Sequence, residues 1–205
     1  MNLKSVLPVL MVLIVGGAVL SVLWFVQERD EDAIRRLLLD YTRSRMTAEG
    51  KVEGRDFTVG SIEILRKNAD TALAHVPVKL GAEVEPRFYE LRRTNSGWAI
   101  ECDLVEHFRK AVEQEGFAKG VSERVARTLA DRFRMTATVT MEGKPFVFRL
   151  ERVGADVVSR CRSAFLLERT DGKPDRIEYV EDFRYRSGQW IVEGQGQLLQ
   201  FRNVR

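Results

Sequence analysis

The chain has 205 residues, of which 44% are hydrophobic and 31% are charged, and its formal net charge is +3. Lys and Arg are scattered among Asp and Glu, which argues against the clustered basic surface that nucleic-acid binding needs. Only two histidines occur, far apart in the sequence, whereas a metal site needs three or four converging ligands. We therefore expect no nucleic-acid partner, no metal and no cofactor.

The first predicted element is a transmembrane helix. Residues 6–26 form an unbroken apolar run without a charged side chain. About 20 apolar residues, at 1.5 Å rise each, cross the hydrocarbon core of a bilayer. A cleaved signal peptide is the alternative, but the run continues beyond the length of a usual signal core. We expect residues 1–27 to anchor the chain in a lipid bilayer.

Small residues in this run are candidate contacts with partner helices. Gly17 and Ser21 form a small-xxx-small pair, with Gly16 beside them, and such pairs let helices approach closely. Small residues are common in membrane spans anyway, so helix pairing stays open. Trp24 is expected at the membrane interface, which favours amphipathic indole rings.

Charges on either side of the run bear on its orientation. The mainly acidic residues 27–32 follow it directly, which favours an amino terminus in the cytoplasm. Arg35, Arg36, Arg43 and Arg45 count against that orientation, although arginines in a folded helix carry less weight. We favour a globular part outside the cytoplasm.

The remaining residues are predicted to form two units, over residues 28–104 and 105–205. An Ala-Asp pair recurs in a turn between strands, at Asp70 and again at Asp156. Further on, each half has a hairpin whose Gly turn is followed by a Trp on the return strand. Such internal similarity predicts that both halves share one plan.

Each half opens with a helical pattern. Asp30 or Asp32 is a candidate cap for the first helix, and Ser122 for the helix of the second half. A short helix over about residues 105–115 is predicted to join the halves, with Gly116 and Gly120 as plausible stops.

The rest of each half alternates with a period of two, which predicts antiparallel strands. Trp98, Ile100 and Cys102 fall on one face of their strand, and Trp98 and Trp190 are expected to anchor the core. The predicted fold class is therefore α+β: one amino-terminal transmembrane helix followed by two tandem units, each a helix plus an antiparallel meander.

Cys102 and Cys161 are interpreted first as buried free thiols, because free cysteine is a common small core residue. A disulfide between the two halves is the alternative, and it needs Cα atoms within about 7 Å.

A helix followed by an antiparallel meander, with a Gly-Trp hairpin near its end, resembles the nuclear-transport-factor-2-like (cystatin-like) superfamily. With a membrane helix in front, the chain resembles its anchored members, which include assembly components of type IV secretion systems and Mce-associated membrane proteins. The resemblance covers residues 30–205 as a pattern only, and it carries no residue roles across. It implies a single-pass protein of the bacterial inner membrane, with its globular part in the periplasm. A typical secretion component of this kind has one unit, whereas two are predicted here.

The function expected is that of a non-catalytic, membrane-anchored scaffold or accessory subunit of a larger membrane complex. One alternative is a module that holds a lipid or small hydrophobic molecule in a sheet pocket. The other is a pocket enzyme, whose available groups are Asp70, Asp156, Tyr41, Tyr89 and Tyr179. Both aspartates fall in predicted turns, where Asp has a local role, so we expect no catalysis.

Overall fold

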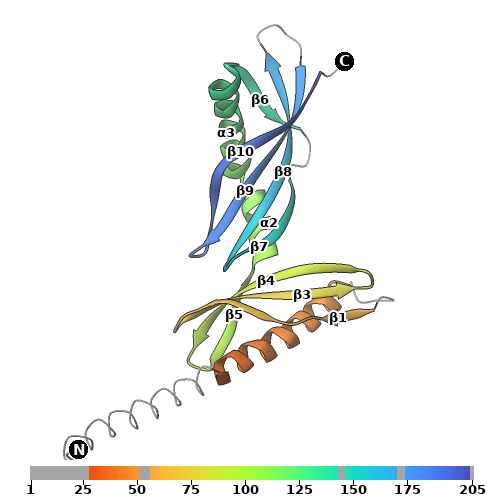
Figure 1. Cartoon of the computed structure of the whole chain (residues 1–205), viewed down its shortest axis with the longest axis vertical. Coiled ribbons are helices and arrows are strands. Elements are labelled where there is room, and N and C mark those ends of the chain that lie inside the picture. The colour runs from red at the N-terminus through yellow and green to blue at the C-terminus, as the bar shows by residue number, and fades with distance from the viewer. Residues whose placement is uncertain (1–27, 51–55, 143–145, 170–173, 204–205) are drawn as a thin grey trace, which may run out of the picture.

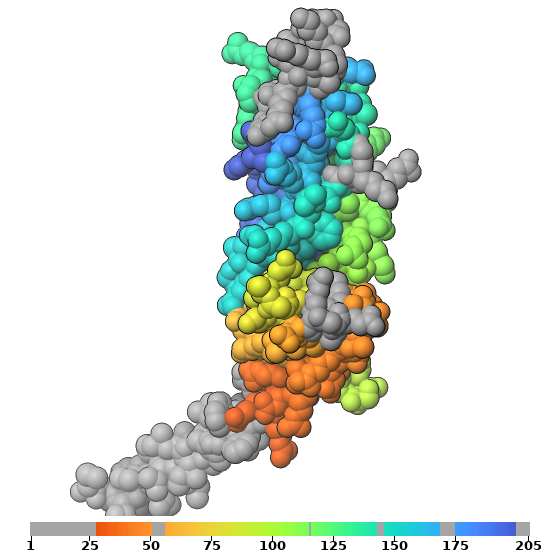
Figure 2. All heavy atoms as spheres, turned by 90° about the vertical axis from the view of Figure 1, so that its right-hand side faces the viewer, coloured from red at the N-terminus to blue at the C-terminus, as the bar shows by residue number. Residues whose placement is uncertain are grey.

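The computed structural model describes residues 28–50, 56–142, 146–169 and 174–203. They form two antiparallel sheets of five strands each, and a helix lies against each sheet (Figure 1). The two parts follow one another along the long axis of the molecule (Figures 1 and 2). The predicted α+β class with antiparallel sheets is confirmed for these residues.

The transmembrane part of the predicted fold class is wrong for the described residues. No helix among them is long and apolar enough to cross a membrane. The first described helix covers residues 28–48, and it alternates buried apolar side chains such as Ile34 and Leu38 with exposed charged ones. The apolar run at 6–26, including Gly16, Gly17, Ser21 and Trp24, lies outside the described residues.

The first sheet contains β1 (Phe57–Val59), β2 (Glu63–Lys67), β3 (Thr71–Leu80), β4 (Glu83–Thr94) and β5 (Gly97–Asp103). Its order is β1-β3-β4-β5, and β2 also pairs with β3. On one face of β3, the side chains of Ala72, Ala74, Val76 and Val78 are buried in one cluster with the helix over 28–48. The other face of β3, which carries Leu73, points away from that helix.

Two helices connect the sheets. The helix α2 (Leu104–Glu113) is capped by Asp103, whose carboxylate accepts a hydrogen bond from the backbone N–H of Val105. After a break at Gln114, α3 (Glu115–Phe133) follows. The sequence predicts that Gly116 and Gly120 stop a helix, but both lie inside α3, so that prediction is wrong.

The predicted helix starts are wrong as well. Asp30 lies within the first helix, where its carboxylate pairs with the Arg93 guanidinium at 2.8 Å and does not cap. Ser122 lies in the middle of α3. In both cases a polar residue next to an apolar pattern has the chemistry of a cap, although the helix extends on either side of it.

The second sheet contains β6 (Ala137–Met141), β7 (Val147–Val153), β8 (Asp156–Arg169), β9 (Pro174–Arg186) and β10 (Gln189–Asn203). Its order is β10-β9-β8-β6, with β7 pairing with β8. The strands β6 to β10 of the second sheet therefore pair in the same order as β1 to β5 of the first sheet. The predicted boundaries of the two units stay predictions, although α2 does begin at Leu104.

A bulge changes the predicted face of β5. The pairing with β4 shifts register between Glu90 and Leu91, opposite Cys102 and Ile100. Because one extra residue reverses the alternation, Trp98 and Ile100 pack against the first cluster while Cys102 packs against the core of the second part. The prediction that all three side chains share one face is therefore wrong.

A buried arginine is the main polar feature of the first core. Arg87 on β4 is 2% exposed, and its guanidinium lies 2.9 Å from Glu85, 3.1 Å from Glu49 and 3.5 Å from Asp103. Burial raises the pKa of Asp103, and the positive charge of Arg87 opposes that rise. Among the described residues Arg87 is the cation paired with the buried Asp103, whereas Glu49 also pairs with Arg45.

Replacing Arg87 with Met should lower the free energy of unfolding by about 3–5 kcal/mol, because buried negative charge is left unpaired. Without Arg87, the pKa of Asp103 in the folded variant should rise further. As the pH falls, the folded variant then binds a proton at Asp103 before the unfolded chain does, and this proton uptake reduces the loss of stability. Urea unfolding at several pH values measures this. Arg92→Met, on the same strand but with a 62% exposed side chain, is the control and should cost less than about 1 kcal/mol. Equal losses of stability in both variants would contradict the conclusion that Arg87 compensates buried negative charge.

A close approach at Gly196 fixes the path of β10. A Cβ at this position would lie 2.0 Å from the hydroxyl oxygen of Tyr179, whose side chain is buried beneath the strand. Gly196→Ala should therefore lower the free energy of unfolding by about 1–3 kcal/mol. Gly116→Ala, with no atom near its new Cβ, should leave stability unchanged or raise it by up to about 1 kcal/mol. Urea titrations of both variants decide this, and an unperturbed Gly196→Ala would show that β10 can shift.

Candidate functional site

The junction between the two sheets is apolar at its centre. Leu73 of β3 and Phe88 of β4 lie on the face of the first sheet that its own helix does not cover. They are 3% and 1% exposed, and they belong to the same apolar cluster as Leu150 and Tyr185 of the second sheet. The uncovered face of the first sheet is therefore buried against the second sheet, whose strands β7 and β8 end beside β4 (Figure 1).

Polar contacts surround this apolar centre. The Tyr185 hydroxyl donates a hydrogen bond to the Glu90 carboxylate, and the Cys102 sulfur lies 3.6 Å from the same hydroxyl oxygen. The Tyr185 ring is buried, and burial is the largest cause of the raised pKa of its hydroxyl. The neutral phenol is thus held as a donor to a carboxylate of the other sheet.

Two ion pairs join the outer parts of the junction. Arg66 of β2 lies 3.2 Å from Asp156, at the start of β8, and Glu63 of β2 pairs with Arg152 of β7. The predicted local turn role of Asp156 is therefore incomplete, because its carboxylate also contacts Arg184. Asp156 and Arg152 flank the hairpin turn that the internal similarity of the sequence indicates.

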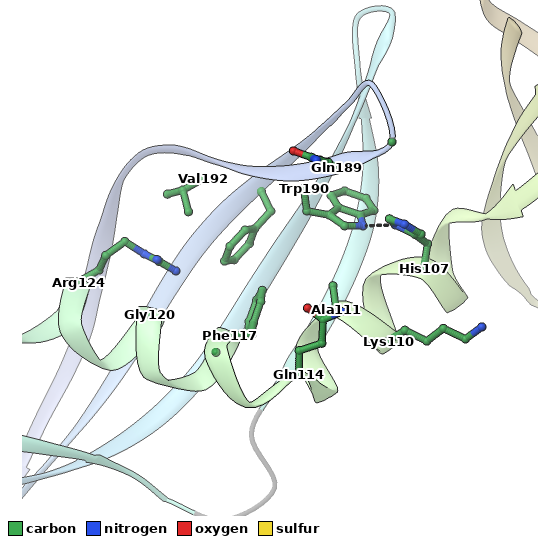
Figure 3. A pocket seen from close by; sticks show the side chains of 13 residues that line it. His107, Lys110, Ala111, Gln114, Phe117, Gly120, Arg124, Gln189, Trp190 and Val192 are labelled. Carbon is green, nitrogen blue, oxygen red and sulfur yellow. Dashed lines mark hydrogen bonds between the residues drawn. The ribbon is translucent and has the colours of Figure 1, made fainter.

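A groove lies beside the junction, in the second part of the molecule. It has a volume of about 700 Å³ and is bounded by α2, α3 and the strands β9 and β10 (Figure 3). Phe117, Phe183 and Trp190 form its aromatic lining, and the Phe117 and Phe183 rings lie 5.0 Å apart. Lys110 and Arg124 lie toward opposite ends (Figure 3).

His107 connects the groove to the junction. Its Nδ1 accepts a hydrogen bond of 3.0 Å from the Trp190 indole N–H, and its ring lies edge-on to Tyr185 at 5.6 Å (Figure 3). The same histidine thus orients a groove residue and packs on the junction tyrosine.

His75 lies beside the junction as well. Its ring stacks on Phe88 at 4.9 Å, and burial lowers its pKa, an effect that the nearby Glu63 opposes and Arg152 increases. It belongs to the junction. Among the described residues no group of three His, Cys, Asp or Glu side chains is arranged to hold a metal ion.

The five groups named for a pocket enzyme do not meet in the groove. Tyr89 is bound by the Thr42 hydroxyl in the first core, and Asp70 lies at the turn before β3. Tyr179 lines a separate, smaller cavity, and Tyr41 borders another one between the first helix and α2. The groove itself is not predicted from the sequence, although Gly116, Gly120 and Arg124 recur every four residues on one face of α3.

The arginines on the solvent face of the second sheet are paired with acids. Arg160 and Asp182 form a two-bond pair, with both distances at 3.0 Å, and Arg162 pairs with Glu178. Arg184 contacts Glu193. Because each of these guanidinium groups faces a carboxylate, this face presents mixed charge and no basic stripe among the described residues.

Comparisons with known proteins identify no relative. No protein-family model matches the chain, and neither curated proteins nor solved structures give a match. The resemblance to the nuclear-transport-factor-2-like superfamily stays a prediction from pattern.

Both cysteines are free thiols in the structure, so the geometry gives no support to the predicted disulfide. Cys102 borders the junction, and Cys161 on β8 is buried in the second core. Burial raises the pKa of Cys102 to about 11 and that of Cys161 to about 12.

At pH 8 the folded chain should therefore react very slowly with Ellman's reagent, since about one thiol in a thousand or fewer is ionised. Unfolding in guanidinium chloride should release two reactive thiols. Rapid reaction of the folded chain would contradict the burial of both thiols. A chain that shows no thiols even after unfolding would establish the disulfide instead.

Proposed function

We propose that this chain is a non-catalytic scaffold subunit whose two sheet units are held at a fixed mutual orientation. The observation that carries the proposal is the apolar cluster that Leu73 and Phe88 share with the second core. A surface of this kind resembles a domain core more than a transient contact, and inter-domain contacts without it usually allow relative motion.

Two further features support the proposal. The junction is fixed in register by hydrogen bonding between Tyr185 and Glu90 and by the Arg66–Asp156 and Glu63–Arg152 pairs. Of the groups named for a pocket enzyme, Tyr41 and Tyr179 lie in separate cavities, so these groups do not converge on one site. The fixed junction supports a role in positioning partners.

The predicted partners are a lipid bilayer and other subunits of a membrane complex. Those predictions rest on residues 6–26, which lie outside the described residues. The periplasmic location and the helix-packing role of Gly16, Gly17 and Ser21 rest on the same residues, and they stay predictions too.

Pulsed electron paramagnetic resonance tests the fixed orientation. Spin labels at Thr58→Cys in β1 and Lys119→Cys in α3, both exposed positions, should give a single narrow distance distribution in the full chain. Leu73→Asp should broaden it, because a carboxylate without a partner in the junction favours separation. Lys79→Asp is the control: it lies on the same face of the same strand but is exposed, so the distribution should stay narrow.

A broad distribution in the unaltered chain would overturn the scaffold proposal, as would Leu73→Asp behaving like Lys79→Asp. A second measurement tests assembly directly. The tagged full chain, purified in mild detergent from its native host, should retain stoichiometric subunits that Leu73→Asp loses and Lys79→Asp keeps. A chain that purifies alone and monodisperse would contradict the proposal.

A further inference from the structure

Aromatic side chains are partly exposed in the groove beside the junction, although the fold does not require their exposure. The core between α3 and the second sheet is filled by Val121, Val125, Leu129 and Phe165, all buried, and the groove lies at the edge of this core, over Phe183. Trp190 and Phe117 are only partly buried, and they face the groove. Its volume of about 700 Å³ lies within the range of sites that hold small organic molecules.

Glycines keep the groove open on both sides. A Cβ at Gly116 of α3 or at Gly188 of the β9–β10 turn would meet no atom within 4 Å. At Gly120 a Cβ would meet only the Nη1 atom of Arg124, at 3.3 Å. Side chains at these positions would project into free space, so the open volume is a consequence of the sequence.

The charge that borders the groove has one sign. Lys110 and Arg124 line it, whereas no Asp or Glu is among its described lining residues, in a chain that has 30 acidic residues. Arg124 is already compensated by Glu181, at 2.6 and 2.8 Å, from behind. Across the parts of the chain that the structure describes, Lys110 forms no ion pair, so one ammonium group is left to meet an anion.

From this arrangement we propose that the groove binds a small apolar molecule with one anionic head, its body against Phe117 and Trp190, over the buried Phe183, and its head at the α2 end of the groove, where Lys110 lies (Figure 3). An aromatic body fits best, because offset and edge-on ring contacts add to the burial of apolar area. A carboxylate is the head we commit to, and a phosphate monoester shares its charge and hydrogen-bonding chemistry. The inference is independent of the scaffold proposal.

The probe is 1-naphthylacetate, titrated into the full chain and followed by ligand-observed NMR. Its neutral methyl ester reports the contribution of the apolar body, and 1-naphthyl phosphate distinguishes the two kinds of head. We expect saturable binding of the carboxylate, about fivefold tighter than that of the ester, which is the size expected for one exposed charge pair. Tighter binding of the phosphate would replace the carboxylate assignment by a phosphate one.

Three variants locate the site. Gly116→Leu should fill the groove and weaken both the acid and the ester more than tenfold while the chain stays folded, because its new side chain meets only open space. Lys110→Gln should weaken the acid about fivefold and leave the ester within twofold. Lys119→Gln, an exposed lysine of α3 outside the groove, is the control and should change neither.

The proposal is overturned if 1-naphthylacetate shows no saturable binding at millimolar concentration. It is also overturned if acid and ester bind equally, or if Gly116→Leu binds both as well as the unaltered chain does. A circular dichroism spectrum of each variant, matched to that of the unaltered chain, shows that a loss of binding reflects the groove and not unfolding.

Discussion

The face of the first sheet that carries Leu73 and Phe88 has no cover within its own unit. The helix over residues 28–48 buries the opposite face, and a sheet with two apolar faces needs a layer on each. The second unit supplies that layer through Leu150, Tyr185 and the hairpins beside them. Exposing this face to water would cost several kcal/mol of free energy, because its apolar side chains would no longer be buried. The hydrophobic effect that folds each unit therefore also opposes their separation.

The position of the groove follows from this constraint. The helix α2 starts at the end of β5, and its His107 contacts both Tyr185 in the junction and Trp190 in the groove. The aromatic lining is therefore held by residues that also hold the units together.

Much of the fold could be predicted from period and turn chemistry, whereas the contacts between distant segments could not. The alternation of β3 and the Gly-Trp hairpins place the strands correctly, since each depends on near neighbours in sequence. The bulge opposite Cys102 reverses an alternation that the sequence does not mark. Gly116 and Gly120 are wrongly predicted to end a helix, because glycine is common both at helix ends and where a helix borders open space. Only the three-dimensional surroundings of a glycine distinguish these two cases. The partners of Asp156 and His75 include side chains of the other unit, so no local pattern could indicate them.

The central claim is that the two units form one core, and differential scanning calorimetry of the full chain tests it most directly. If the junction is part of the core, the described units unfold in a single cooperative transition, with equal calorimetric and van't Hoff enthalpies. Two separable transitions, or a van't Hoff enthalpy near half the calorimetric one, would show two independent domains and would contradict the account.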